Sequence, residues 1–313
     1  MKRVVIYLHG KGGSAAEAEH YRSLFPQYEV IGLDYQADTP WKAREEFSMF
    51  FNALAEKYDN IVLIANSIGA YYAINSGIEN LIAKAYFISP IVDMEKLICD
   101  MMHWAGVSEK QLEEQKTVHT EFGEDLSWEY LQYVRNNPVN WSVPTEILYG
   151  RNDNMTSLKT MESFAKNHEA GLTVMDNGEH WFHTAEQMNY LDNWIREKEQ
   201  RRQSMNKYIG YCGLDCEQCE ARIATEKNDD ELRNKVAVLW SQLNGVEIIP
   251  SMINCTGCRL EGVKSAYCDA LCPIRKCAMA KGCETCGDCP DMGTCDKLAG
   301  ITANNPDALK NLK

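Results

Sequence analysis

Short apolar runs alternate with longer amphipathic segments over the first two hundred residues of the chain. Runs of this kind, rich in Val, Ile and Leu, are typical of strands that are buried on both faces, and the segments between them are typical of helices. We interpret six runs as strands: Arg3–Leu8, Tyr28–Leu33, Ile61–Ala65, Ala83–Ile88, Thr145–Tyr149 and Leu172–Met175. This alternation predicts an α/β fold with a mainly parallel sheet of about six strands, covered by helices on both faces.

The segments between the strands supply the predicted helices. Helical patterns span about Ala15–Phe25, Trp41–Tyr58 and Thr184–Lys198. Between residues 91 and 142 the alternation stops, and no good strand pattern occurs there. Three helical segments take its place, at about Met94–Trp104, Ser108–Lys116 and Ser127–Asn136. We therefore expect a helical insertion after the fourth strand, with methionine and aromatic side chains that pack a small core of its own.

A second domain begins where the composition changes. All seven histidines precede residue 184, whereas twelve of the thirteen cysteines follow residue 211. Residues 197–207 are charged and carry no apolar stripe. The one long helical pattern beyond them spans about Asp229–Leu243. We therefore predict one domain at residues 1–200, a linker at 201–207 and a second domain at 208–313.

The cysteines of the second domain predict metal binding. Their spacing includes several Cys-x2-Cys pairs, in which two thiolates of one turn can reach the same ion. The twelve candidate ligands are Cys212, Cys216, Cys219, Cys255, Cys258, Cys268, Cys272, Cys277, Cys283, Cys286, Cys289 and Cys295. A disulfide scaffold is the alternative, but it requires an oxidising compartment, and we find no export signal in the N-terminal residues.

The identity of the metal and the grouping of the ligands stay open at this stage. Because the second domain has no histidine, each site would be formed by cysteines alone, and we expect two or three tetrahedral Zn²⁺ sites. An iron–sulfur cluster is the alternative, because Cys283-x2-Cys286-x2-Cys289-Pro290 is similar to part of a ferredoxin sequence, although the fourth cysteine at its usual spacing is missing. The sequence does not tell which cysteines share an ion. With little apolar sequence for a core, metal binding would supply much of the folding free energy.

The charge of the chain argues against two classes of partner. The net charge is −13 at pH 7, and acidic residues outnumber basic ones in both predicted domains. A chain of this sign does not attract nucleic acid or an anionic membrane. No apolar run is long enough to span a membrane, and the N-terminal run ends at Leu8, too early for a signal peptide. We therefore expect a cytoplasmic protein with neither nucleic-acid nor membrane partners.

Polar residues follow three of the predicted strands. Ser67 stands where a strand turns sharply into a helix, between the small residues Ala65 and Gly69. Such a turn is typical of a nucleophile elbow, which presents a hydroxyl beside the free N–H groups of a helix N-terminus. Asp153 follows the fifth strand, and His180 follows the last one. Because parallel strands end at one edge of their sheet, we expect the three side chains to meet there.

With this chain order of Ser, Asp and His, residues 1 to about 200 resemble a small α/β-hydrolase of the serine esterase kind. The likeness rests on His9-Gly10, Asn66-Ser67-Ile68-Gly69, Gly150-x-x-Asp153 and Gly178-Glu179-His180-Trp181-Phe182. It implies that the insertion at about 91–142 is a cap over the nucleophile. It also implies that His180 is the general base and that Asp153 orients it. The backbone N–H groups of Ile68 and Lys11 would form the oxyanion hole.

Three other residues compete for these roles: Gly12 as the second oxyanion donor, Asp93 as the acid and His183 as the base. We prefer Asp153 as the acid because a Gly-x-x-Asp turn is its usual location in hydrolases of this kind. His183 lies one helical turn after His180 and more reasonably caps or packs the final helix.

The second domain resembles a bacterial cysteine-rich domain family of unknown function. The likeness rests on Tyr211-Cys-Gly-Leu-Asp-Cys-x2-Cys, Cys255-x-Gly-Cys and Ile274-Arg-x-Cys-Ala. It implies metal binding but no activity. We expect this domain to regulate access to the first domain or to dock a protein partner.

Together, these patterns predict a serine hydrolase that cleaves a small-molecule acyl substrate, a small carboxylic ester, through an acyl-enzyme. An ester is chemically the easiest substrate, but the residues do not distinguish it from a thioester or an amide. The hydrolase domain requires no cofactor. The alternative is a non-catalytic binding protein that responds to metal or redox state and is built on an idle hydrolase fold.

Overall fold

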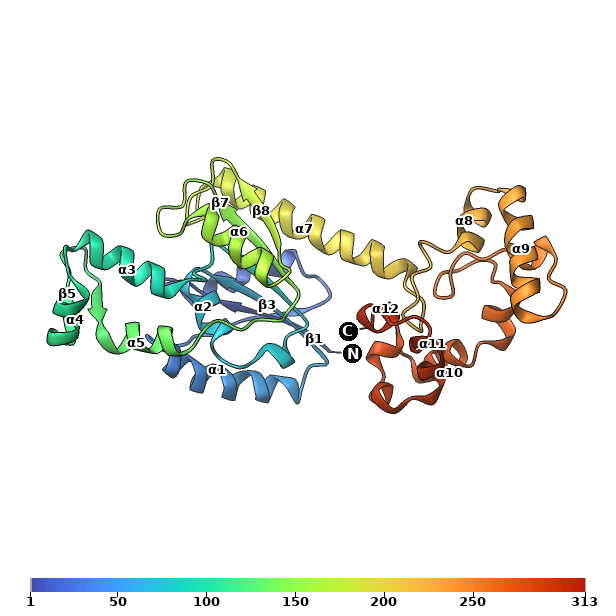
Figure 1. The fold of residues 1–313 in the computed structure, drawn as a ribbon, viewed down its shortest axis with the longest axis horizontal. Coiled ribbons are helices and arrows are strands. Elements are labelled where there is room, and N and C mark those ends of the chain that lie inside the picture. Colours follow the sequence, from blue (N-terminus) through green and yellow to red (C-terminus); the bar gives the residue numbers. More distant parts are fainter. Residues whose placement is uncertain (1, 313) are drawn as a thin grey trace. The chain divides into compact units, whose positions relative to one another are not determined.

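The structure is a computed structural model that describes residues 2–312, and for residues 201–206 it describes the backbone only. The chain divides into two compact units, Met1–Arg196 and Glu197–Lys313. Helix α7 (Ala185–Tyr208) runs across the division (Figure 1). The residues predicted to form a linker, 201–207, therefore belong to a helix. The reason is that no glycine or proline interrupts this segment, and its Glu, Gln, Arg and Lys residues favour helix formation.

A six-stranded sheet forms the centre of the first unit (Figure 1). Its strands are β1 (Arg3–Leu8), β2 (Glu29–Gly32), β3 (Asn60–Asn66), β4 (Lys84–Ile88), β7 (Thr145–Gly150) and β8 (Gly171–Met175). They lie in the order β2-β1-β3-β4-β7-β8, and every neighbouring pair is parallel. This arrangement confirms the predicted parallel sheet and places the carboxyl ends of all six strands at one edge.

The strands direct alternate side chains into two hydrophobic cores. In β1, Val4, Ile6 and Leu8 belong to one core, whereas Val5 and Tyr7 belong to the other. The first core is completed by the helices α1 (Pro40–Ala55), α2 (Ile68–Ile74) and α6 (Leu158–Asn167). The second is completed by the 3₁₀ helix η1 (Ala15–Ser23) and the first part of α7. With both faces covered, the loops at the carboxyl edge are left to carry a site.

The insertion between β4 and β7 contains the three predicted helices and a hairpin that was not predicted. The helices are α3 (Met94–Trp104), α4 (Glu109–Gln115) and α5 (Trp128–Asn136), and the antiparallel strands are β5 (Thr117–His119) and β6 (Asp125–Ser127). The expectation that this region lacks strands was wrong, because three-residue strands are too short to give a recognisable alternation. The insertion packs on α1 through Trp41, whose ring centroid lies 5.7 Å from that of Tyr130 on α5.

The second unit consists of short helices joined by irregular loops. Its helices are α8 (Glu220–Glu226), α9 (Asp230–Asn244), α10 (Pro273–Lys281), α11 (Asp296–Thr302) and α12 (Asp307–Lys310). Helix α9 confirms the one long helix that was predicted. Two small hydrophobic cores lie among these helices, one of four buried residues and one of three. Across residues 2–312, the helices lack the combination of length and apolar character that crossing a membrane requires.

Candidate active site

Ser67 lies at the junction of β3 and α2 in a strained backbone conformation, with φ 51° and ψ −120°. Non-glycine residues rarely adopt a positive φ, and such strain costs about 1–3 kcal/mol. The surrounding chain enforces it, because the Ser67 amide donates to the carbonyl oxygen of Ile88 at 3.0 Å. The turn also requires glycine at position 69, where a Cβ would lie 2.5 Å from the carbonyl oxygen of His9. The hydroxyl does not cap α2 and is therefore available for another partner.

That partner is His180, whose Nε2 lies 2.8 Å from the Ser67 hydroxyl oxygen. The other ring nitrogen, Nδ1, lies 2.7 Å from Oδ2 of Asp153. A neutral imidazole that donates Nδ1–H to a carboxylate has its Nε2 lone pair free to accept a proton from a hydroxyl. The Asp153 side chain is fully buried and that of His180 is 15% exposed. The structure thus brings together the three side chains that the sequence singled out, in what we call the Ser67–His180–Asp153 cluster.

Backbone donors hold the Asp153 carboxylate in place. Its Oδ1 accepts hydrogen bonds from the amides of Met155 at 2.7 Å and Thr156 at 3.0 Å. Its Oδ2 accepts from the Thr156 hydroxyl at 3.3 Å as well as from the imidazole. The buried carboxylate therefore has hydrogen-bond donors to both of its oxygens without water.

The loops that carry Asp153 and His180 are joined to each other. The Asn152 amide donates to the carbonyl oxygen of Gly178 at 2.8 Å. A Cβ on Gly150 would lie 2.5 Å from that same oxygen, so the close approach requires glycine at position 150. The two glycines in the predicted motifs therefore bring the acid loop and the base loop into contact.

The competing residues have other partners. Asp93 caps α3, and its Oδ1 accepts from the amide of Lys96 at 2.9 Å. Nδ1 of His183 lies 2.6 Å from the carbonyl oxygen of Trp181 and 3.8 Å from a Glu179 oxygen. Neither residue has a contact with Ser67, so the arrangement favours Asp153 and His180 over them.

Two backbone amides in segments that border Ser67 are not used by the hydrogen bonds of their own helix or turn. Ile68 is the first residue of α2, and the first amides of a helix have no partner within it. Gly10 to Gly13 form a turn that is closed by a hydrogen bond of 3.1 Å, and Lys11 occupies its second position, whose amide the turn does not use. A Cβ on Gly10 would lie only 3.2 Å from the Ser67 Cβ, so this turn borders the hydroxyl. The Lys11 ammonium group points to the insertion, where it forms an ion pair with Glu124.

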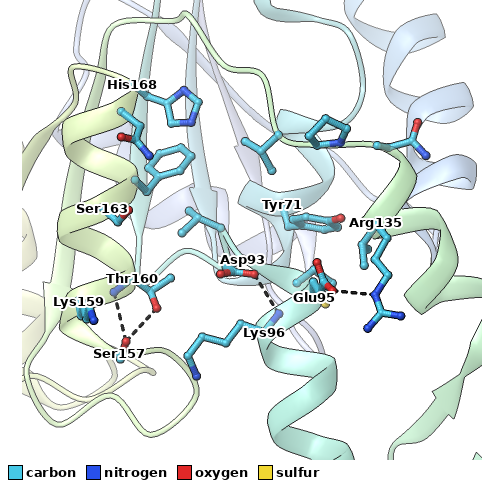
Figure 2. Close-up of a pocket in the computed structure, with 18 residues that line it drawn as sticks. Tyr71, Asp93, Glu95, Lys96, Arg135, Ser157, Lys159, Thr160, Ser163 and His168 are labelled. Atoms are coloured by element: carbon cyan, nitrogen blue, oxygen red, sulfur yellow. Dashed lines mark hydrogen bonds and ion pairs between the residues drawn. The ribbon is translucent and has the colours of Figure 1, made fainter. Parts of the chain in front are cut away.

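A polar cavity of about 540 Å³ beside α6 was not predicted (Figure 2). It is lined by Tyr71 of α2, the first turn of α3, residues 134–139 and one side of α6. Much of its charge is already paired, since Arg135 forms ion pairs with Glu95 and Glu109. The Ser67–His180–Asp153 cluster does not line it. Because the lining comes from four separate segments, no local sequence pattern could have indicated it.

All thirteen cysteines lie in the described part of the chain, and none of them forms a disulfide. Five of them line a small cavity: Cys277, Cys283, Cys286, Cys289 and Cys295. Among the other seven in the second unit, the thiol of Cys268 contacts Cys255, and its hydrogen bond lowers the pKa of Cys255 below the usual value of a thiol. A similar contact from Cys216 lowers the pKa of Cys258. In residues 2–312, no group of three or more Cys, His, Asp or Glu side chains is arranged so that it could hold a metal ion, so metal binding stays a prediction.

Comparison with known proteins relates the two units to different groups. Residues 208–300 match a family described as "Protein of unknown function (DUF3795)". A comparison of the sequence with curated proteins finds no match. The family match agrees with the cysteine-rich second domain that the sequence predicted.

The first unit is similar to solved α/β-hydrolase structures. Est1E from Butyrivibrio proteoclasticus has a TM-score of 0.52 at 13% identity and covers 64% of this chain and 88% of its own. The same protein with ferulic acid bound has a TM-score of 0.50 at 15% identity, with coverage of 64% and 88%. Mouse alpha/beta hydrolase domain-containing protein 10 has a TM-score of 0.51 at 14% identity, with coverage of 63% and 90%. The first unit therefore has the α/β-hydrolase fold that the sequence predicted.

Proposed function

We propose that the first unit is a serine hydrolase that cleaves a small carboxylic ester or thioester through an acyl-enzyme. The observation that carries the proposal is the continuous chain of hydrogen bonds from Ser67 through His180 to Asp153. The strained backbone of Ser67 supports it. A serine that only capped a helix would need neither an imidazole partner nor a positive φ.

In the proposed reaction, the Ser67 oxygen attacks the acyl carbon, and its proton passes to Nε2 of His180. The separation of 2.8 Å between the two atoms is within the range for direct proton transfer. Asp153 keeps Nδ1 protonated and offsets the positive charge of the imidazolium. Collapse of the tetrahedral intermediate expels the alcohol or thiol, which takes the proton from His180. A water molecule then releases the acid by the same steps, with His180 again as the base.

The amides of Ile68 and Lys11 are the proposed donors to the oxyanion. Both belong to segments that border the Ser67 side chain, and both are free of the hydrogen bonds within their own helix or turn. Each donor to a developing oxyanion contributes about 3 kcal/mol in comparable hydrolases. Backbone amides suit this role because the chain fixes their positions before the reaction starts.

Two exposed apolar side chains support an uncharged, apolar group in the substrate. Met155, two residues after Asp153, is 38% exposed, and Trp181, next to His180, is 68% exposed. Large apolar side chains at the surface beside reactive groups favour an alkyl or aryl substituent over a charged one. A short-chain p-nitrophenyl ester is therefore a suitable first substrate.

A fluorophosphonate probe tests the proposal, because it labels only activated serines. We expect the full chain to be labelled at Ser67 and to hydrolyse p-nitrophenyl butyrate, and we expect Ser67→Ala to lose both properties. The matched control is Ser163→Ala, which alters an exposed serine that lines the polar cavity and should change neither. Equal hydrolysis by the wild type and Ser67→Ala would refute the proposal. Parallel rates on butyrate esters and thioesters then define the substrate class.

A further inference from the structure

The turn that carries the proposed oxyanion donor Lys11 has little rigidity of its own. It spans residues 10–13, of which all but Lys11 are glycines. One hydrogen bond of 3.1 Å, from the Gly13 amide to the carbonyl oxygen of Gly10, closes it. Gly12 has a φ of 75°, which glycine adopts without steric cost. Lys11 therefore supplies the only side chain by which other parts of the chain can hold this turn.

The residues on either side of the turn are held by side chains. At its first end, the Tyr35 hydroxyl donates to the carbonyl oxygen of His9 at 2.7 Å, and the two rings stack with their centroids 4.2 Å apart. At its other end, the Ser14 amide donates to Oε1 of Glu17 at 3.0 Å. Between these two ends the turn is exposed at Lys11, so a contact of the Lys11 side chain has the most influence on its position.

The Lys11 side chain contacts the insertion that follows β4. Its ammonium group donates a hydrogen bond to Oε2 of Glu124 and forms an ion pair with it. The two residues lie 113 positions apart in the chain, so this pair joins the insertion directly to the turn. The side chains are 67% and 38% exposed, and dissolved salt can therefore screen the attraction between them.

The backbone of Glu124 is held at the closed end of the β5–β6 hairpin. The Thr120 hydroxyl donates to the carbonyl oxygen of Glu124 at 2.6 Å and accepts from its amide at 3.2 Å. The Thr120 amide donates to the same carbonyl oxygen at 3.2 Å. Leu126, two residues further on, is 2% exposed and belongs to the larger core of the first unit. Hydrogen bonds and the core thus fix the segment that presents the Glu124 carboxylate.

The same carboxylate is within electrostatic reach of α2, the helix that begins after Ser67. Burial chiefly raises the pKa of the Tyr72 hydroxyl on this helix, and the negative charges of Asp38 and Glu124 raise it further. Tyr72 stands five residues after Ser67, on the helix whose first amide is the other proposed oxyanion donor. Glu124 is therefore near both of the elements that carry the proposed donors.

We propose that Glu124 is a positioning residue for the oxyanion hole: through its ion pair with Lys11, it holds the glycine-rich turn so that the Lys11 amide faces the developing oxyanion. An oxyanion donor contributes most when its position is fixed before the charge develops. The ion pair provides this fixation at the one side chain of the turn. The proposal rests on the proposed hydrolase function, since it assigns a role in that reaction to a residue of the insertion.

The test compares Glu124→Gln with Asp125→Asn in the full chain. Each variant removes one negative charge from the same hairpin, but Asp125 pairs with His119 instead of Lys11. Hydrolysis of p-nitrophenyl butyrate is measured per active site, titrated with the fluorophosphonate probe, so that misfolded chains do not count. We expect Glu124→Gln to lower kcat about two- to fivefold, the range for exposed ion pairs, with KM unchanged, and Asp125→Asn to keep the wild-type kcat. Equal kcat for wild type and Glu124→Gln, or an equal loss in both variants, overturns the proposal.

Salt and a double variant separate positioning from a structural role of Glu124. With NaCl raised to about 1 M, which screens exposed charges, the wild-type kcat should fall toward that of Glu124→Gln, whose own kcat should stay level. Lys11→Met keeps the backbone amide, and its combination with Glu124→Gln should lose no more activity than either single variant. Losses that multiply in the double variant, or equal salt dependence of wild type and Glu124→Gln, overturn the proposal and leave the hydrolase function standing. A wild type with neither labelling nor hydrolysis overturns both.

Discussion

Helices on both sides of the sheet enclose thirty-nine and seventeen buried residues in the two hydrophobic cores of the first unit, whereas the cores described in the second unit contain four and three. The cysteines are distributed in the opposite way, with one in the first unit and twelve in the second. Apolar burial stabilises a fold in proportion to the area removed from water. The second unit buries little apolar area in its described cores, and it contains most of the cysteines.

Because of this difference, we expect the fold of the two units to depend to different degrees on their reactive side chains. In the first, Asp153 and His180 stand on loops that the sheet and its glycine contacts hold in position, so the scaffold does not depend on them. In the second, five cysteines line one small cavity, and four pack against the three-residue core: Cys212, Cys272, Cys286 and Cys295. Loss of a reactive group should therefore abolish activity in the first unit and folding in the second.

The largest expected effect follows from metal removal. We expect a chelator under reducing conditions to expose the backbone amides of the second unit to hydrogen exchange, since a structural thiolate site contributes about 10–16 kcal/mol. The amides of β1 and β3 should stay protected, because their surroundings are packed by apolar residues. Hydrogen exchange with mass spectrometry measures both units at once.

Addition of Zn²⁺, or of iron and sulfide, provides the control for this experiment and should restore protection. If the second unit kept its protection after complete removal of metal, its fold would not depend on thiol ligation, and the contrast between the units would be lost.

The next effect concerns catalysis without unfolding. Asp153→Asn should lower kcat by about 10⁴-fold, because an amide favours the imidazole tautomer that lacks a free lone pair on Nε2. The unfolding transition of the first unit should change little by comparison. Ester hydrolysis and thermal denaturation measure the two quantities.

Asp93→Asn is the matched control. It changes the competing acid, and asparagine caps a helix about as well as aspartate does. We expect it to retain near wild-type kcat and stability. A loss of activity in Asp93→Asn as large as that in Asp153→Asn would assign the acid differently.

A substitution in the core of the first unit tests how much apolar burial stabilises that unit. Phe47 is fully buried in the first unit, and Phe47→Ala should lower its free energy of unfolding by about 3–5 kcal/mol, through lost burial and the cavity that remains. Phe122→Ala removes the same side chain from a position that is 46% exposed and should cost about 0.5 kcal/mol. Chemical denaturation followed by tryptophan fluorescence compares the two variants. Similar costs for both would show that apolar burial does not dominate this unit.

The two units also differ in how far the sequence could predict them. The strands and the Ser67–His180–Asp153 cluster were predictable because each side chain lies within five residues of the end of a strand, and parallel strands bring such positions to one edge. Gly69 and Gly150 added a local signal, since both positions tolerate no side chain. Local sequence and global fold point to the same arrangement here.

Other features depend on contacts that no local pattern contains. The β5–β6 hairpin was missed because each strand has only three residues, and Leu126 is the one buried side chain among these six residues. The continuation of α7 through residues 201–207 was missed because this segment has no apolar stripe, and helix propensity alone is a weak signal. The five cysteines that line one small cavity stand up to eighteen positions apart in the sequence, and spacing alone does not determine which of them meet.

The smallest effect concerns the support of the acid in the first unit. Thr156→Val removes the hydroxyl donor at 3.3 Å from Oδ2 of Asp153 and keeps the amide donor at 3.0 Å from Oδ1. A hydrogen bond from a hydroxyl to a charged carboxylate contributes about 1.5–3 kcal/mol when its geometry is good. Because this bond is long, its contribution should be smaller. We therefore expect kcat to fall about two- to tenfold with KM unchanged. Thr156→Ser keeps a hydroxyl and should restore most of the rate. A loss near that of Asp153→Asn would mean that the hydroxyl, rather than the backbone, positions the carboxylate, and the first unit's site would then depend on a side chain for its geometry.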